Sequence, residues 1–161
     1  MKKRIGFIAM SGVRAHNEQL TQLGLTLPGF VERNKQIASL PSLGLLTLAG
    51  MTPRDRFEVE YHEIADLKKL PELPTDFDLV AISTFTAQFY EACEVADHYR
   101  RRGVLVVMGG ITVSALPEQA REHSRVWCSA RGNRSGRRCC AILNTAASSR
   151  STRSHLRASL I

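Results

Sequence analysis

Two short segments of the chain are continuously apolar, "FDLVAISTF" at residues 77–85 and "VLVVMGG" at residues 104–110. Apolar runs of this length are typical of strands that are buried on both faces, which occur in parallel sheets covered by helices. The stretch between them, residues 87–103, has its arginines at the end and stops at a glycine, as a helix does. A strand, a helix and a second buried strand in this order predict a parallel β-α-β unit.

The rest of residues 1–124 extends this unit. Residues 4–10 predict a first strand, and residues 40–51 place apolar residues at helical spacing after a proline. Residues 57–65 alternate as a half-exposed edge strand does, and residues 115–124 begin another helix. We therefore predict an α/β fold, an open parallel sheet with flanking helices of the flavodoxin-like or Rossmann-like kind, incomplete at its C-terminal end.

The formal net charge of +7 lies entirely at the end of the chain. Residues 1–125 contain 15 Lys and Arg and 15 Asp and Glu, whereas residues 126–161 contain 7 arginines and no acidic residue. The predicted domain at residues 1–124 is thus nearly neutral, which disfavours nucleic-acid binding. We expect residues 125–161 to be a disordered Arg/Ser-rich tail. A basic-tailed nucleic-acid-binding protein stays as an alternative.

The N-terminus and the cysteines indicate the compartment and the metal chemistry. The apolar run "IGFIAM" is too short for a signal-peptide core or a membrane span, so we expect a cytoplasmic protein without a membrane partner. Cys93 is alone in the predicted domain, and the adjacent pair Cys139 and Cys140 suits neither zinc nor an iron–sulfur cluster. We expect no metal site formed by protein side chains and no iron–sulfur cluster.

Open parallel sheets bind ligands beyond the carboxyl ends of their strands. That rule selects residues 11–14, 83–86 and 109–114. Glycines without a Cβ let a bulky ligand approach the backbone, and hydroxyl groups donate or accept hydrogen bonds. The same residues also suit simple turns and caps. The candidate cofactor-binding residues are Ser11, Gly12, Ser83, Thr84, Thr86, Gly109, Gly110, Thr112 and Ser114.

Three segments together resemble the N-terminal cobalamin-binding domain of cobalamin-dependent radical S-adenosylmethionine proteins. "LPSLGLLTLAG" is similar to the first helix of that family, "DLVAIST" to its third strand, and "VVMGGITVSALPE" to its fourth strand and following turn. The resemblance covers about residues 4–124. It implies that the nucleotide tail of cobalamin runs past Ser83 and Thr84 at one strand end and past Gly109 and Gly110 at the next.

The chain departs from that family at two places. Thr112 stands where the family often has a histidine, and the DxHxxG motif of the mutase branch is missing after the first strand. The resemblance therefore implies no protein imidazole on cobalt from the usual position. We expect His16, His62 and His98 to be ordinary surface residues.

These features predict a fragment of a radical S-adenosylmethionine-type protein that binds cobalamin. Full-length relatives would couple cobalamin to radical chemistry such as methyl transfer, but the catalytic barrel is not expected in this chain, so we expect no enzymatic activity from it alone. A flavodoxin-like nucleotide-binding or regulatory module is the alternative, because it shares the strand order. Its usual signatures, a GxGxxG segment or a P-loop, are missing from the sequence.

The family continues with a fifth strand and a Gly-Glu-Gly-Glu turn, whereas this chain reads "VWCSARGNRSG". Residues 130–136 permit the codons GCG AGG GGG AAC CGC AGT GGC, and the frame that starts one base earlier, at a preceding G, encodes GEGEPQW. We interpret residues from about 125 onward as an out-of-frame translation that truncates the domain. Loss of the strand would leave an unpaired edge, and loss of the turn would make cobalamin binding weak or absent.

Sequencing the gene tests this frameshift interpretation. We expect the second frame to stay open up to the codon of Arg153 and to encode the glycine–glutamate turn, because both follow from permitted codons. A coding strand that is incompatible with this second frame excludes the interpretation.

Overall fold

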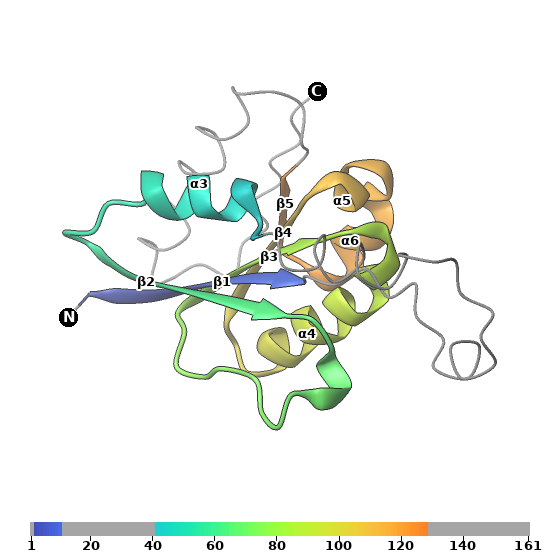
Figure 1. The fold of residues 1–161 in the computed structure, drawn as a ribbon, viewed down its shortest axis with the longest axis horizontal. Coiled ribbons are helices and arrows are strands. Elements are labelled where there is room, and N and C mark those ends of the chain that lie inside the picture. The colour runs from blue at the N-terminus through green and yellow to red at the C-terminus, as the bar shows by residue number, and fades with distance from the viewer. Residues whose placement is uncertain (1, 11–40, 129–161) are drawn as a thin grey trace, which may run out of the picture.

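The computed structural model describes residues 2–10 and 41–128, with side chains up to residue 125 (Figure 1). The candidates Ser11 and Gly12 and the predicted tail from residue 129 onward lie outside the described residues. The domain boundary predicted at residue 124 and the frameshift therefore stay predictions.

A five-stranded sheet forms the centre of the described structure, in the order β2-β1-β3-β4-β5. Every neighbouring pair of strands is parallel. This confirms the predicted α/β fold with an open parallel sheet, and each predicted strand is present within a few residues of its predicted ends. The strands are β1 (Lys3–Met10), β2 (Phe57–Ile64), β3 (Leu79–Thr84), β4 (Leu105–Gly109) and β5 (Val126–Cys128).

Strand β5 differs from the sequence expectation. Its 3 residues, Val126–Cys128, pair with the end of β4 so that Cys128 lies opposite Gly109. We expected the last strand to be missing and β4 to be an unpaired edge, and for these residues that expectation was wrong. The strand forms because main-chain hydrogen bonding to a parallel neighbour needs only an extended backbone, whatever side chains it carries.

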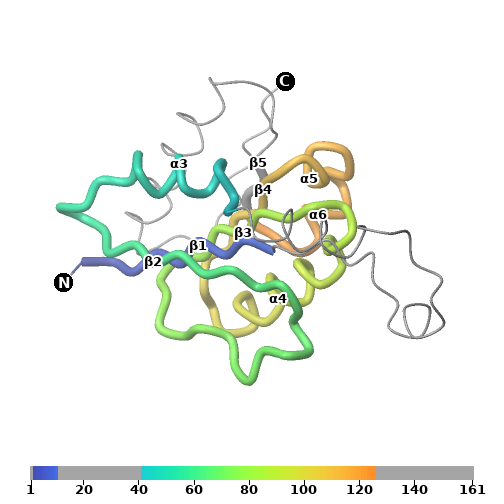
Figure 2. Tube along the Cα trace, viewed as in Figure 1, coloured from blue at the N-terminus to red at the C-terminus, as the bar shows by residue number. Residues whose placement is uncertain are grey.

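Helices cover both faces of the sheet (Figures 1 and 2). Helix α3 lies on one face, and α4, α5 and α6 contribute residues to the core on the other. Helix α5 was not predicted, because we interpreted its segment as a turn. The helices are α3 (Leu43–Met51), α4 (Phe89–Arg101), α5 (Ile111–Ala115) and α6 (Pro117–His123), with single 3-10 turns at Leu67–Lys69 and Thr86–Gln88.

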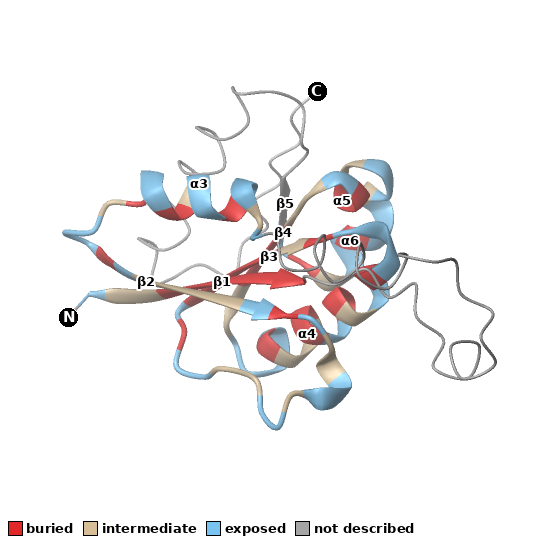
Figure 3. Ribbon diagram, in the orientation of Figure 1, coloured by how far each residue is buried: buried red, intermediate tan, exposed pale blue. Residues whose placement is uncertain are grey.

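The core consists of two apolar clusters, one on each face of the sheet (Figure 3). On the α4 face, Ile82 and Met108 belong to the same cluster as Val95 and Tyr99 of the helix. On the α3 face, Phe7 and Ala81 pack with Leu45 and Ala49 of that helix, among others. Successive strand residues alternate between the clusters, so β1 and β3 are buried on both faces, as their continuous apolar runs predict.

Helix α3 is fixed at its start by a chain of two hydrogen bonds. The Ser42 backbone N–H donates to the Tyr61 hydroxyl (2.9 Å), which in turn donates to Glu63 Oε1 (2.9 Å). Burial raises the pKa of Tyr61, so its proton stays in place to make the second bond. Polar contacts therefore hold helix α3 against the edge strand β2, in addition to the burial of Leu45 and Ala49 of the helix.

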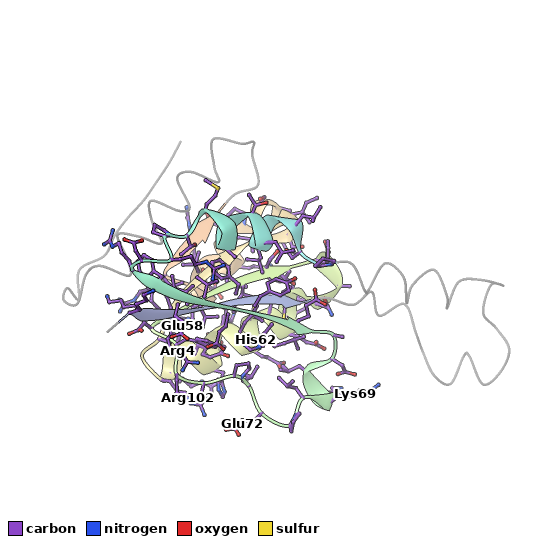
Figure 4. All side chains as sticks on the ribbon, turned by 60° about the vertical axis from the view of Figure 1, so that its left-hand side comes forward. Arg4, Glu58, His62, Lys69, Glu72 and Arg102 are labelled. Carbon is purple, nitrogen blue, oxygen red and sulfur yellow. The ribbon has the colours of Figure 1, made fainter. Side chains whose placement is uncertain are left out.

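A polar cluster on the other face holds the long connection between β2 and β3. The Arg4 guanidinium pairs with Glu60 and lies 5.6 Å from the centroid of the Phe77 ring. Figure 4 shows Arg4 close to Glu58, with Lys69 and Glu72 on the connection itself. The pKa of Glu60 is lowered, chiefly by its hydrogen bond with Arg4.

The Phe77 ring also occupies the space above Gly6. A Cβ added to Gly6 would lie 2.8 Å from two carbon atoms of that ring. The aromatic ring thus packs directly on the backbone of β1, and the connection is seated on the sheet at this point.

Replacing Tyr99 by Phe tests how much the connection contributes to stability. The buried Tyr99 hydroxyl donates a 2.6 Å hydrogen bond to the Pro74 carbonyl oxygen. We expect Tyr99→Phe to lower the free energy of unfolding by about 1–2 kcal/mol, because the carbonyl loses its donor. Urea denaturation measures the change. Tyr90→Phe in the same helix is the control, since Tyr90 is 76% exposed; equal losses in both variants would contradict the assignment.

Candidate functional site

The carboxyl ends of β1, β3 and β4 meet at one edge of the sheet. Met10 pairs with Thr84, and Ser83 pairs with Gly109. Helix α3, which comes between β1 and β2 in the chain, packs on one face of the sheet, whereas α4, which comes between β3 and β4, packs on the other. The gap between β1 and β3 is therefore the topological switch point, where open α/β sheets place their ligands.

Small residues form a row across this edge on the α3 face. Ala9, Ser83 and Gly109 are direct neighbours on three adjacent strands. Ser83 follows Leu79 and Ala81 at alternate positions, so its side chain lies on the α3 face with theirs. It is partly buried, and its hydroxyl has no hydrogen-bond partner among the described residues. The row combines little side-chain bulk with a hydroxyl that is available to a ligand.

Gly109 and Gly110, at the end of β4 and directly after it, differ in their backbone conformation and surroundings. Gly110 has φ 110° and ψ 179°, and an added Cβ would lie 2.9 Å from the Thr84 carbonyl oxygen. This backbone conformation is almost exclusive to glycine. Gly110 therefore lets the two strand ends pack together, and its contact with a ligand stays a prediction. Gly109 has no positive φ and lies in the row itself, so the ligand argument applies to Gly109.

The other candidate hydroxyls make contacts within the protein. Thr84 is buried and donates to the carbonyl oxygen of the next residue (2.9 Å). The hydroxyl oxygens of Thr86 and Thr112 lie 3.1 Å apart and share a hydrogen bond. Ser114 donates to the Gly110 carbonyl oxygen (3.0 Å). These bonds join the loops after β3 and β4 and leave Ser83 as the candidate with a free hydroxyl in the described part of the chain.

Two residues at this edge were missed by sequence reasoning. Phe85 directly follows β3, Ile111 lies two residues after the end of β4, and they are 56% and 66% exposed. We placed Phe85 at the end of a buried strand and Ile111 in the turn after the next strand, and we named neither as a candidate residue. The signal that could have found them is their position, directly after the strand-end residue Thr84 and directly after the pair Gly109-Gly110.

Polar clusters elsewhere are accounted for by contacts within the fold. A cavity of about 600 Å³ at the amino end of β4 is lined by Asp97, Arg100, Arg101 and Arg125, among others. Asp97 there pairs with Arg100 (3.2 Å) and with His123 Nδ1 (2.9 Å). This cavity lies at the edge opposite the candidate residues.

The described residues offer no nucleophile or metal cluster at the candidate edge. Burial raises the pKa of the Cys93 thiol to about 11, so it stays protonated and unreactive at neutral pH. Within residues 2–10 and 41–128, no group of three or more His, Cys, Asp or Glu side chains is placed to hold a metal ion. In the same part of the chain, no helix has the length and apolar character to cross a membrane.

Comparison with known proteins gives a partial similarity. No family model matches the chain. Over 49 residues it is 43% identical to the bacteriochlorophyllide d C-8(2)-methyltransferase of Chlorobaculum tepidum. The match covers 30% of this chain and 11% of that enzyme. The chain therefore has a distant, local similarity to a methyltransferase and matches only a small share of its length.

Substitution of Gly110 tests the close approach of the two strand ends. We expect Gly110→Ala to lower the free energy of unfolding by about 2–3 kcal/mol, because the backbone conformation excludes a side chain and Thr84 blocks it. Chemical denaturation measures the loss. Gly50→Ala is the matched control, since nothing lies within 4 Å of its added Cβ; it should raise the free energy by about 0.5–1 kcal/mol. A stable Gly110→Ala protein would contradict the assignment.

Proposed function

We propose that the described part of the chain is a cobalamin-binding domain of a radical S-adenosylmethionine-type protein. The observation that carries the proposal is the row of Ala9, Ser83 and Gly109 beside the switch point, with a partly buried hydroxyl that the described protein does not use. A bulky ligand needs small side chains where it enters and a polar group that orients it. The residues of the row fit both needs.

Each residue of the site has a separate part in this proposal. Gly109 admits the nucleotide tail of the ligand against the backbone of β4, and Ser83 gives that tail a hydrogen bond. Gly110 and the Thr86–Thr112 pair hold the two loops in place around it. Cobalamin, when bound, supplies a cobalt centre suited to methyl transfer. The chain's own residues bind and orient the cofactor, and none of them is proposed as a catalytic residue.

The similarity to a methyltransferase supports the same class of chemistry. The sequence motifs imply relatives that couple cobalamin to reactions such as methyl transfer, and the matched relative is by name a methyltransferase. Both of these lines depend on the sequence, whereas the row of small residues is an observation of the fold.

A flavodoxin-like nucleotide-binding module shares the strand order found here. Phosphate groups are usually held by cations or by the N-terminus of a helix. Residues 83–86 and 109–116 include no Lys or Arg, and α5 has 5 residues. The described edge is therefore better suited to a ligand bound through apolar and hydroxyl contacts.

Titration of the full chain with hydroxocobalamin tests the proposal. We expect a weak, saturable change in the corrin absorption spectrum, which Gly109→Val abolishes because its side chain fills the row. Ser83→Ala should weaken binding about tenfold, as expected for loss of one hydrogen bond in a partly buried site.

Gly50→Val is the matched control for the glycine substitution, because open space surrounds Gly50 on the outer side of α3. It should leave binding unchanged, and urea denaturation should show that Gly109→Val remains folded. A chain that never changes the spectrum, or that binds equally well with Val at position 109, contradicts the proposal.

A further inference from the structure

We propose that the cavity at the amino end of β4 is a second binding site, which takes the phosphate group of a small organic ligand. It lies at the edge of the sheet opposite the candidate corrinoid site, so the inference goes beyond the proposed function and does not depend on it. The cavity has a volume of about 600 Å³, and small-molecule sites usually measure roughly 300–1,000 Å³.

The lining of this cavity is positively charged. Its charged residues are Arg100, Arg101, Arg125 and Asp97, so three positive charges stand against one negative charge and two positive charges remain. The C-terminal end of α4 adds only about −0.5 of an elementary charge, which does not cancel them. A phosphate monoester carries about −1.5 to −2 charges at pH 7 and matches this excess better than a carboxylate, which carries a single charge.

Two of the arginines have guanidinium nitrogens that the described residues do not use. The Arg101 Nε–H donates to the Asp97 carbonyl oxygen (3.2 Å), which fixes the guanidinium and leaves both terminal nitrogens without a partner in the described part of the chain. The Arg125 side chain makes no hydrogen bond or ion pair with residues 2–10 or 41–125. Guanidinium groups bind phosphate oxygens through paired, charge-assisted hydrogen bonds, so both arginines can hold a phosphate group.

Contacts between α4 and α6 hold the arginines around the cavity. Asp97 Oδ2 lies 2.9 Å from His123 Nδ1, and the Arg100 guanidinium donates to a carbonyl oxygen of α6. The hydroxyl of the buried Ser124 donates to another carbonyl oxygen of that helix (2.7 Å), which fixes the backbone directly before Arg125. The backbone positions of the arginines are therefore set before a ligand binds, which lowers the cost of binding.

The rest of the lining suits an organic group beside the phosphate. Val104 and Leu105 are partly buried, and Gly103 has no side chain to fill the space. A phosphate group is only a few water molecules in size, and one water occupies about 30 Å³ of the liquid. It would fill a minor part of the cavity, so a phosphate ester with a compact apolar body fits better than the free ion.

Nuclear magnetic resonance titration of the isotope-labelled full chain tests the site. We expect phenyl phosphate to shift the backbone amide signals of Gly103 and Leu105 saturably. Benzoate should bind about tenfold more weakly, because it has a similar apolar body but a single charge. Inorganic phosphate should also bind more weakly, because it lacks the apolar body. Signals at the cavity distinguish this site from the arginines of residues 126–161.

Substitution of the two arginines with unused nitrogens tests their part in the site. Arg101→Gln and Arg125→Gln should each weaken phenyl phosphate binding about tenfold, as expected for lost hydrogen bonds to a charged group. Arg102→Gln is the matched control, because it removes the same charge one position away from an arginine that does not line the cavity. It should change the affinity by about twofold at most. All three arginines are exposed, so the urea midpoints should stay close to that of the natural chain.

Several outcomes would overturn the site. Equal weakening by Arg102→Gln would show general attraction by charge, and benzoate binding as tight as that of phenyl phosphate would remove the preference for phosphate. Signals of Gly103 and Leu105 that do not shift, or shift without saturation, would exclude a bound ligand. Equal affinity for inorganic phosphate would overturn the organic part of the ligand.

Hydroxocobalamin titration of the same variants separates this inference from the proposed function. Arg101→Gln and Arg125→Gln should leave corrinoid binding unchanged, because the two sites lie at opposite edges of the sheet. A natural chain that binds phenyl phosphate without hydroxocobalamin contradicts the proposed function alone, and the reverse result contradicts the phosphate site alone. Parallel loss of both ligands in the arginine variants would overturn the assignment of a separate site.

Discussion

The close approach of Gly110 to the backbone of Thr84 determines the geometry of the candidate site. It brings the loop after β4 against the end of β3, and the Thr86–Thr112 hydrogen bond continues the contact one step further. As a result, backbone packing positions the row of small residues. The site therefore needs little help from long, flexible side chains to keep its shape.

Most of the fold was predictable because strands that are buried on two faces have continuously apolar sequences. The runs at β1, β3 and β4 are continuously apolar, and α4 ends in arginines and a glycine. Helix α5 could not be predicted in this way, since 5 residues are too few for a helical period to appear. Strand β5 was missed for a different reason, because it depends on a neighbour's hydrogen bonds more than on its own composition.

The candidate site was predictable as a place but not in its details. The rule for open parallel sheets located the edge, and seven of the nine candidates lie there within the described residues. Which hydroxyls are used by the protein itself depends on contacts between loops, such as that of Ser114 with the Gly110 carbonyl oxygen. Likewise, adjacent glycines look alike in a sequence, whereas their φ angles show that one serves the fold and the other lies in the row.

The Phe77 ring on Gly6 has a consequence for how sequences of this kind can diverge. A side chain at position 6 would occupy the same space as the ring, so position 6 cannot take one while Phe77 is kept. A larger residue at position 6 requires a smaller one at position 77, and the pair should therefore vary together among homologues. Such linked variation would record a contact between the first strand and a connection more than seventy residues away in the chain.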